Sequence, residues 1–293
     1  MSKYSEKNIT FKILGENYLK TRIYKFFILF FGFILDIWQN KFLIYQLTKR
    51  DFQNKYIGSS LGFIWTIINP FVMLFILWMV FEKAFAAGPV NNIPFFVWLM
   101  SGLISWDFFS NTLVGSTNVF QEYSYLVKKI NFRIAILPIV KILSSFFTHL
   151  ILLFISIIIL FVNDIPFSWY WFQIFYYLFA LNVLLLGISW ITSSLQVFLK
   201  DMSQIINIII QFGFWITPIV WNYADTLTGQ SLLFIKFNPM FYIIEGYRNS
   251  FLFEKPFWEL PEQTFYFWTV TLIILIIGVF LFRKLRPHFA DVL

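Results

Sequence analysis

The sequence predicts an all-α integral membrane protein with six transmembrane helices, an N-terminal interfacial amphipathic helix and a re-entrant helical hairpin before the last span. Two properties of the chain support this class. Hydrophobic residues make up 59% of it and charged residues only 13%, against about 25% charged residues in soluble domains. The mean hydropathy is +0.73, and several uncharged stretches are long enough to cross a hydrocarbon core of roughly 30 Å.

Composition also excludes several kinds of chemistry. The chain has no cysteine, so disulfides, thiolate metal sites and cysteine nucleophiles are excluded. Its net charge of +7 lies largely near the N-terminus, which fits anionic lipid headgroups and not nucleic acid. The only two histidines, His149 and His288, are far apart, so we expect no histidine metal site. We expect His149, within an apolar segment, to hydrogen-bond another helix and not to carry protons.

The N-terminal part divides into a cytoplasmic or interfacial segment, 1–35, followed by the transmembrane domain, 36–293. The apolar run 26–35 is too short to span, so we expect it to lie at the interface and not to form a thin span. The first residues are polar and charged, with no apolar core followed by a small-residue cleavage site, so we expect no cleaved signal peptide. We expect an interfacial helix over 36–57, where rings favoured at membrane interfaces fall near one line of a helix. These are Trp38, Phe42, Tyr45, Phe52 and Tyr56.

Six segments qualify as spans by length and apolar character. The joint Gly58–Gly62 before the first span allows the chain to turn into the membrane. The second span is unusually polar, with Ser101, Ser105, Asp107 and Asn111. The expected spans cover 60–82, 94–117, 136–161, 169–197, 203–222 and 264–283.

The segment 230–256 between the last two spans is mostly apolar but contains Lys236, Glu245 and Arg248. Pro239 interrupts any helix there. We expect two short helices that dip into the membrane and return, which is tolerated where broken backbone is buried in protein. A folded amphipathic cap outside the membrane is the alternative. Glu245 and Arg248, three residues apart, are expected to pair on a helix.

The orientation follows from the distribution of Lys and Arg. With the N-terminus inside, 18 of the 22 Lys and Arg lie in or at the edge of the cytoplasmic segments. The four others are Lys83, Lys236, Arg248 and Lys255. The sequence therefore predicts a multi-pass protein with both termini in the cytoplasm.

Three stretches carry a family resemblance. Arg50-Asp51, Tyr56, Leu61-Gly62, Trp65 and Pro70 form the first. The second runs over 199–221 and the third over 238–252. In this order they resemble the permease subunits of bacterial ABC transporters that export polysaccharides such as O-antigen, teichoic acid and capsule. The resemblance runs from about Trp38 to the C-terminus.

The resemblance implies a permease in the bacterial inner membrane that moves a polyprenyl-diphosphate-linked polysaccharide out of the cytoplasm. Its expected partners are itself as a homodimer, two copies of an ABC ATPase, the lipid-linked polysaccharide and membrane lipids. No glycine here is followed by lysine, so a Walker A phosphate loop is absent. We therefore expect no cofactor and no catalytic residue in this chain, with ATP and Mg bound by the ATPase.

The candidate substrate path lies in the second span. An intramembrane carboxylate is costly and should face protein or a water-filled path, and sugar rings stack on aromatic faces. Lipid-facing packing for the rings, and a structural hydrogen bond for the carboxylate, are the alternatives. The candidate residues are Trp98, Trp106, Asp107, Phe108 and Phe109.

Charged residues suggest two further sites. Lys49, Arg50, Lys55 and Tyr56 are candidates for a cytoplasmic gate, where basic side chains contact the carrier's diphosphate or ordinary anionic headgroups. The second site is a coupling surface for the ATPase, although the positive-inside bias alone would account for its lysines. Its candidates are Glu122, Lys128, Lys129, Lys200 and Asp201.

Two other classes remain open from the sequence. A membrane enzyme acting on polyprenyl lipids would need clustered acidic or histidine residues at a membrane face, and no such cluster is evident. An ion-coupled secondary transporter usually has inverted repeats and intramembrane charges. No internal repeat is evident, and Asp107 and His149 give that class little support.

The orientation is testable because the chain has no native cysteine. In spheroplasts, a cysteine at Ala87 or Asp225 should react with a membrane-impermeant maleimide. A cysteine at Lys128 should react only after the inner face is opened. The reverse pattern would show that the orientation is wrong.

Overall fold

The computed structural model describes residues 35, 37–55, 57, 59–129, 132–223 and 229–293. The described part is helical, and it contains no β-strand beyond the isolated bridge between Val90 and Ile93. The chain divides into two compact units, Met1–Leu47 and Thr48–Leu293. The expected N-terminal segment up to residue 34, Tyr56 and Gly58 lie outside the described residues.

The expected interfacial helix is present as α2, Lys41–Asn54. Trp38, Phe42 and Tyr45 are exposed, as a ring-bearing face in contact with lipid requires, while Ile44 and Leu47 are buried. Helix formation is therefore confirmed over most of the expected range. Its placement at the membrane surface stays a prediction.

Four helical stretches in the described part are long and apolar enough to cross a membrane. The last of them, Pro261–Val292, ends with the short helix α14, Phe289–Val292. Within these stretches lie α3, Trp65–Trp78, extended by a π-helix to Ala84, then α7, Leu137–Val162, α8, Gln173–Phe198, and α13, Pro261–Leu285. The stretches are Gly62–Ala84, Ile134–Val162, Trp169–Phe198 and Pro261–Val292.

The other two expected spans are also helices, but they differ from these four. The second, α4, covers Phe95–Thr117 and has the length of a span with a more polar sequence. The fifth, α9, ends at Ile216 after 15 residues. The expectation of a helix through residue 222 was wrong, because Thr217 precedes Pro218 and is extended, with ψ 133°. A residue before proline is disfavoured in the α conformation.

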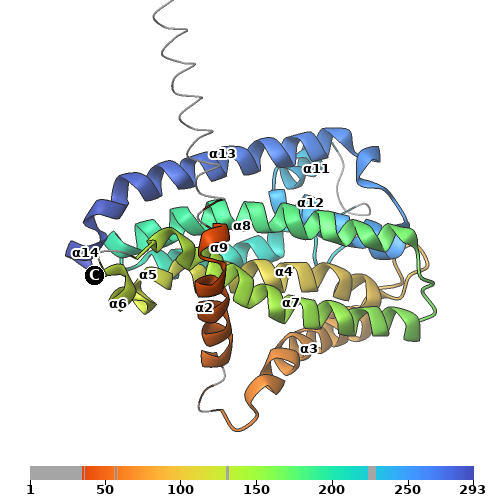
Figure 1. Cartoon of the computed structure of the whole chain (residues 1–293). Helices are drawn as coiled ribbons and strands as arrows, with labels where there is room; N and C mark the ends of the chain where they lie inside the picture. The colour runs from red at the N-terminus through yellow and green to blue at the C-terminus, as the bar shows by residue number, and fades with distance from the viewer. Residues whose placement is uncertain (1–34, 36, 56, 58, 130–131, 224–228) are drawn as a thin grey trace, which may run out of the picture. The chain divides into compact units, whose positions relative to one another are not determined.

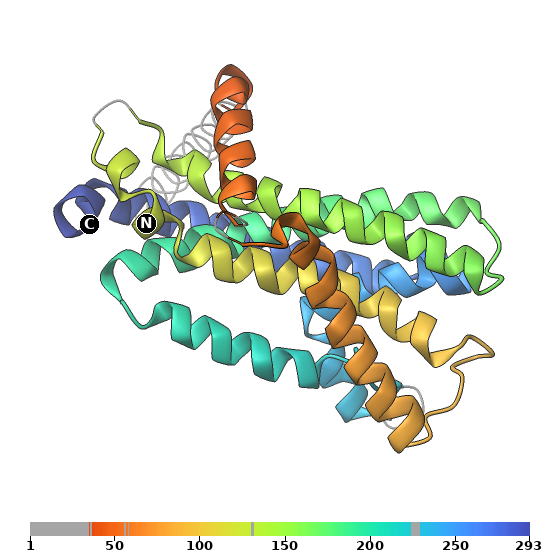
Figure 2. The ribbon, with the colours of Figure 1, turned by 90° about the horizontal axis from the view of Figure 1, so that it is seen from below.

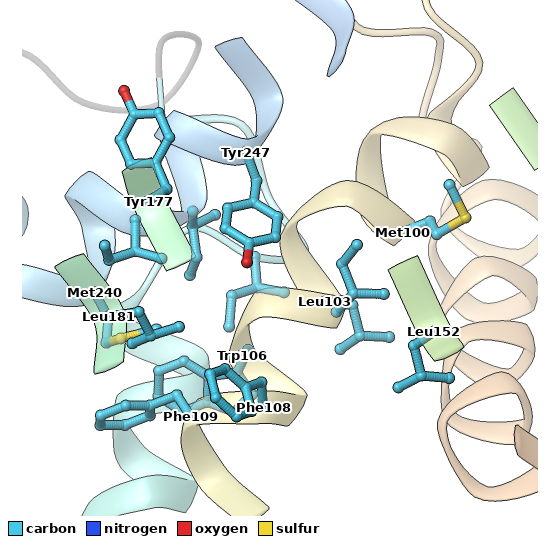
Figure 3. Close-up of a cluster of buried hydrophobic side chains, with 14 of the residues drawn as sticks. Met100, Leu103, Trp106, Phe108, Phe109, Leu152, Tyr177, Leu181, Met240 and Tyr247 are labelled. Atoms are coloured by element: carbon cyan, nitrogen blue, oxygen red, sulfur yellow. The ribbon is translucent and has the colours of Figure 1, made fainter. Parts of the chain in front are cut away.

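Helix α4 occupies the centre of the second unit. It packs against α3, α7, α8, α9 and α12, Pro239–Arg248, and most of its 23 residues are buried. Figure 2 shows α3, in orange, crossing α4, in yellow. Figure 3 shows Trp106, Phe108 and Phe109 of α4 in the buried hydrophobic cluster that also contains Leu181 of α8 and Tyr247 of α12. This central position explains why a polar helix is tolerated, since its hydroxyls meet protein.

Helices α8 and α13 run side by side (Figure 1) and approach at two glycines. A Cβ on Gly187 would lie 2.9 Å from the backbone of Leu275, and one on Gly278 would lie 2.5 Å from the carbonyl oxygen of Gly187. Small residues of this kind let helix backbones approach closely in membranes.

Between α9 and α13 the chain forms short helices, as expected. They are α11, Gln230–Lys236, and α12, Pro239–Arg248. Asn238 caps α12 by accepting a hydrogen bond from the Met240 backbone N–H at 3.0 Å, and Pro239 takes the first helical position. Proline is favoured there because its missing N–H would have no intrahelical partner. The break predicted at Pro239 is confirmed.

The glycine contact between α8 and α13 predicts a large effect from one methyl group. Gly187→Ala should lower the free energy of unfolding by about 1–3 kcal/mol, because backbone must move to admit the methyl. Thermal unfolding in detergent measures it. Gly88→Ala is the control, since a Cβ at Gly88 meets nothing within 4 Å. Equal stability of the two variants would show that this contact is not tight.

Candidate functional site

Two cavities border α3 and share part of their lining. The polar cavity, about 550 Å³, lies between α3, α4 and α7, and Lys55 is part of its lining. The apolar cavity, about 410 Å³, lies between α3, α4 and α9. Pro70, Met73 and Asp107 border both. The polar cavity is lined by hydrogen-bonding side chains, chiefly Lys55, Asn69, Asp107, Asn111, Ser145 and Thr148.

The expected substrate-path residues are divided between these cavities and the packed core. Trp106 and Asp107 line the apolar cavity, and Asp107 and Phe108 line the polar one. Phe109 is buried with its ring centroid 5.4 Å from that of Trp106. Trp98 instead covers the guanidinium of Arg248. The structure thus brings three of the five residues to the cavities.

The expected gate residues are also divided. Lys49 and Arg50 are exposed on α2. Lys55 is also exposed as a residue, but it lines the polar cavity and its ammonium donates to Ser145 Oγ at 3.4 Å. Burial is the main cause that lowers the pKa of Lys55, with Asp51 opposing it and Lys141 adding to it. Lys55 is therefore the gate lysine that can reach a ligand in this cavity.

An ion cluster fixes α2 to the loop after α4. The Lys141 ammonium lies 2.7 Å from Asp51 Oδ1 and 2.5 Å from Glu122 Oε2. The hydroxyl of Tyr123 donates to Asp51 Oδ1 at 3.0 Å. Burial and the neighbouring Asp51 raise the pKa of Tyr123, so it stays a protonated donor. Asp51 is almost fully buried, and two donors share its carboxylate.

A glutamine pair joins the two cytoplasmic elements in which coupling is expected. The short helices α5, Val119–Glu122, and α6, Ser124–Val127, follow α4. The Gln196 amide donates to Gln121 Oε1 at 3.3 Å, and its oxygen accepts from the Ser203 backbone N–H at 2.8 Å. This pair connects α5 to the turn between α8 and α9. The expected coupling residues Lys128, Lys129, Lys200 and Asp201 are exposed there.

Three of these residues were missed by the sequence analysis. Gln121 and Gln196 carry no charge, and 75 residues separate them. Lys141 did have a signal, because a lysine at the edge of an apolar span needs a carboxylate partner. It was counted only toward the orientation.

The residues expected to pair in the interior do so. His149 of α7 and Tyr247 of α12 share a hydrogen bond of 2.9 Å between Nε2 and the phenol oxygen, as expected of a helix-to-helix contact. Phe108 stacks on the His149 ring with centroids 4.7 Å apart. Glu245 and Arg248 form an ion pair at 2.8 Å across one turn of α12. Both expectations are confirmed.

Comparison with known families gives the class. The family model described as "ABC-2 type transporter" matches residues 42–252. The match covers more than half of the chain and includes α2, the helices lining both cavities, and α12. The chain therefore belongs to the ABC-2 transporter membrane family.

The relatives narrow the class. The chain is 24% identical over 264 residues to the O-antigen export system permease protein RfbA of Klebsiella pneumoniae. The aligned region covers 89% of this chain and 96% of the relative. The chain is also 24% identical over 267 residues to the protein of the same name from Myxococcus xanthus, covering 88% and 98%. The similarity thus extends over nearly the full length of both.

The ion cluster predicts a stability effect. Lys141→Met should lower the free energy of unfolding by about 3 kcal/mol, because it leaves the buried Asp51 carboxylate without its cation. Denaturation of the purified protein in detergent measures this. Glu122→Gln is the control, and since the Glu122 side chain is 47% exposed, its loss should cost at most about 1 kcal/mol. Asp51→Asn combined with Lys141→Met should recover part of the loss. Unchanged stability in Lys141→Met would contradict this role.

Proposed function

We propose that this chain is the transmembrane permease subunit of an ATP-driven exporter, which moves a polyprenyl-diphosphate-linked surface polysaccharide out of the cytoplasm across the bacterial inner membrane. The observation that carries the proposal is the similarity to O-antigen export permeases over 89% of the chain. The glycan itself, whether O-antigen, teichoic acid or capsule, is not fixed by this similarity.

In this proposal the chain has six spans, with α4 and α9 joining the four apolar helices. Helix α2 lies at the cytoplasmic interface, and α11 and α12 form a re-entrant hairpin opening to the outside. The interior contacts of α12 support the hairpin, because its buried Arg248 satisfies backbone carbonyls where helix is lacking. Broken backbone at membrane depth needs partners of this kind. Both termini lie in the cytoplasm.

Two ATPase subunits dock on the cytoplasmic side and hold the ATP and Mg. The docking surface is the exposed set Lys128, Lys129, Lys200 and Asp201, next to the partly exposed Glu122. Because Gln121 and Gln196 bind these two turns to each other, a push on either one moves α4 and α8 together. Two copies of this chain form the passage between them.

The substrate enters at headgroup depth. Lys49 and Arg50 on α2 attract the diphosphate of the carrier, and Lys55 receives it in the polar cavity. Asp107, Trp106 and Phe108 border the path beyond it. Neither alternative class gains from the contacts of the interior. In particular His149, one of the two residues offered for ion coupling, is engaged with Tyr247.

Deletion of the gene tests the function. The deletion strain should lose surface polysaccharide and accumulate lipid-linked glycan on the inner side of the membrane, because synthesis continues without export. Immunostaining of intact cells and extraction of carrier-linked glycan from spheroplasts measure the two pools.

A plasmid copy of the wild-type gene should restore both pools and serves as the control. Normal surface polysaccharide without internal accumulation, in a strain that has no second exporter, would exclude the proposal.

A further inference from the structure

We propose that the polar cavity between α3, α4 and α7 is a binding site for the first sugar of the glycan, the one attached to the carrier's diphosphate. The inference rests on the proposed function and adds a specificity to it. The permease selects its cargo at this sugar.

The lining has the chemistry that sugar hydroxyls require. Each hydroxyl both donates and accepts, so a site for vicinal hydroxyls needs groups of both kinds close together. Asn69 offers an acceptor and a donor, and Asp107 offers acceptors. The Asn111 side chain is hydrogen-bonded to Asp107 and keeps its remaining amide groups for the ligand. Thr148 is part of the lining, and its hydroxyl is shielded from solvent and has no hydrogen-bond partner within the described part of the chain. A bound sugar hydroxyl would supply that partner.

Aromatic rings complete the lining. Trp65 and Phe108 border the cavity, and Trp65 is 40% exposed as a residue. The face of a pyranose ring carries C–H groups with partial positive charge, which are attracted to the negative face of an aromatic ring. Phe108 already stacks on His149 with one face, so Trp65 is the ring with a face to offer. The cavity thus combines planar polar groups with an aromatic wall.

The positive charge of Lys55 determines how the ligand is oriented in the cavity. Lys55 is the lysine of the lining, and it follows directly after α2, which ends at Asn54. In a lipid-linked glycan the first sugar is bonded directly to the diphosphate. A phosphate held by Lys55 therefore places that sugar deeper in the cavity, beside Asn69 and Asn111. The lipid tail stays outside the cavity, beyond Lys55.

The size of the cavity limits the ligand to the first part of the glycan. Its volume of about 550 Å³ lies within the roughly 300–1,000 Å³ of small-molecule sites. One or two sugar rings fit, and a polymer does not. The neighbouring apolar cavity is lined mainly by Phe71, Leu74, Leu103, Ile104 and Phe214, and it offers too few polar partners for a sugar. The polar cavity is therefore the sugar site of the two.

The test compares ligands that differ only in the first sugar. The probes are farnesyl diphosphate alone and farnesyl diphosphate bonded to glucose, galactose, N-acetylglucosamine or N-acetylgalactosamine. Equilibrium binding of the radiolabelled probes is measured on the full-length permease in nanodiscs. At least one sugar-bearing probe should bind about tenfold more tightly than the bare diphosphate, the ratio that about 1.4 kcal/mol produces.

Variants of two lining residues test whether the preference for a sugar-bearing probe arises in this cavity. Thr148→Val removes one hydroxyl without changing shape, and Asn111→Leu removes both amide groups. Each should abolish the sugar preference and leave the affinity for bare farnesyl diphosphate unchanged. Thr112→Val is the control, because Thr112 is also a buried threonine without a partner in the described residues but does not line the cavity. It should keep the preference.

Each other outcome overturns the inference. Equal binding of all the probes to the wild-type protein would show that the first sugar is not read. A preference that survives in both Thr148→Val and Asn111→Leu would place the reading elsewhere. If these results occur while deletion of the gene still blocks export, the proposed function stands and only the sugar site is lost. If no probe binds and deletion leaves export intact, both fail.

Discussion

A fully buried guanidinium, that of Arg248, holds together the part of the protein where helix is lacking. Its Nη1 donates to the Pro218 carbonyl at 2.8 Å and to Glu245 at 2.8 Å, and its Nη2 donates to the Ile219 carbonyl at 2.9 Å. A buried cation is costly unless it is paired and hydrogen-bonded. These contacts also satisfy carbonyls that the early end of α9 leaves outside helix. The carbonyls freed after α9 therefore stabilise the buried guanidinium, and the guanidinium in turn satisfies their hydrogen bonds.

The same side chain fixes the position of α4. The ring of Trp98 lies over the guanidinium, 3.5 Å from carbon to centroid, and a Cβ on Gly102 would lie 2.9 Å from Nη2. At the neighbouring residue of α12, Tyr247, a hydrogen bond to His149 joins α12 to α7. With α4 and α7 both held against α12, the side chains of Asp107 and Asn111 are presented to the polar cavity from a rigid frame. A site that reads hydroxyls needs such rigidity.

Local patterns predicted what depends on local sequence. The proline at Pro239 separated α11 from α12, and the spacing of Glu245 and Arg248 placed them one turn apart. The end of α9 at Ile216 was predicted wrongly. The residues that follow are mostly apolar, and this composition was given more weight than the helix-ending effect of Pro218. Contacts between distant residues carried no local pattern, so the cluster at Lys141 and the Gln121–Gln196 pair were missed. The candidate path was predicted as a helix face, but its division between cavity and core depends on which neighbours cover each ring.

Neither cavity is large enough to pass a polysaccharide, and this limits how one chain could form the passage. Their volumes are about 410 and 550 Å³, whereas a polymer needs a continuous channel. Exposed apolar faces alone would not require a second copy, because lipid covers them equally well. However, the exposed side chains of α3 and α9, among them Phe75, Ile76, Phe212 and Trp215, lie on the two helices that border the apolar cavity. Pairing two copies along these helices would join two apolar cavities into one passage. On this arrangement the site that reads the first sugar lies beside the channel that the rest of the glycan follows, and Asp107 borders both.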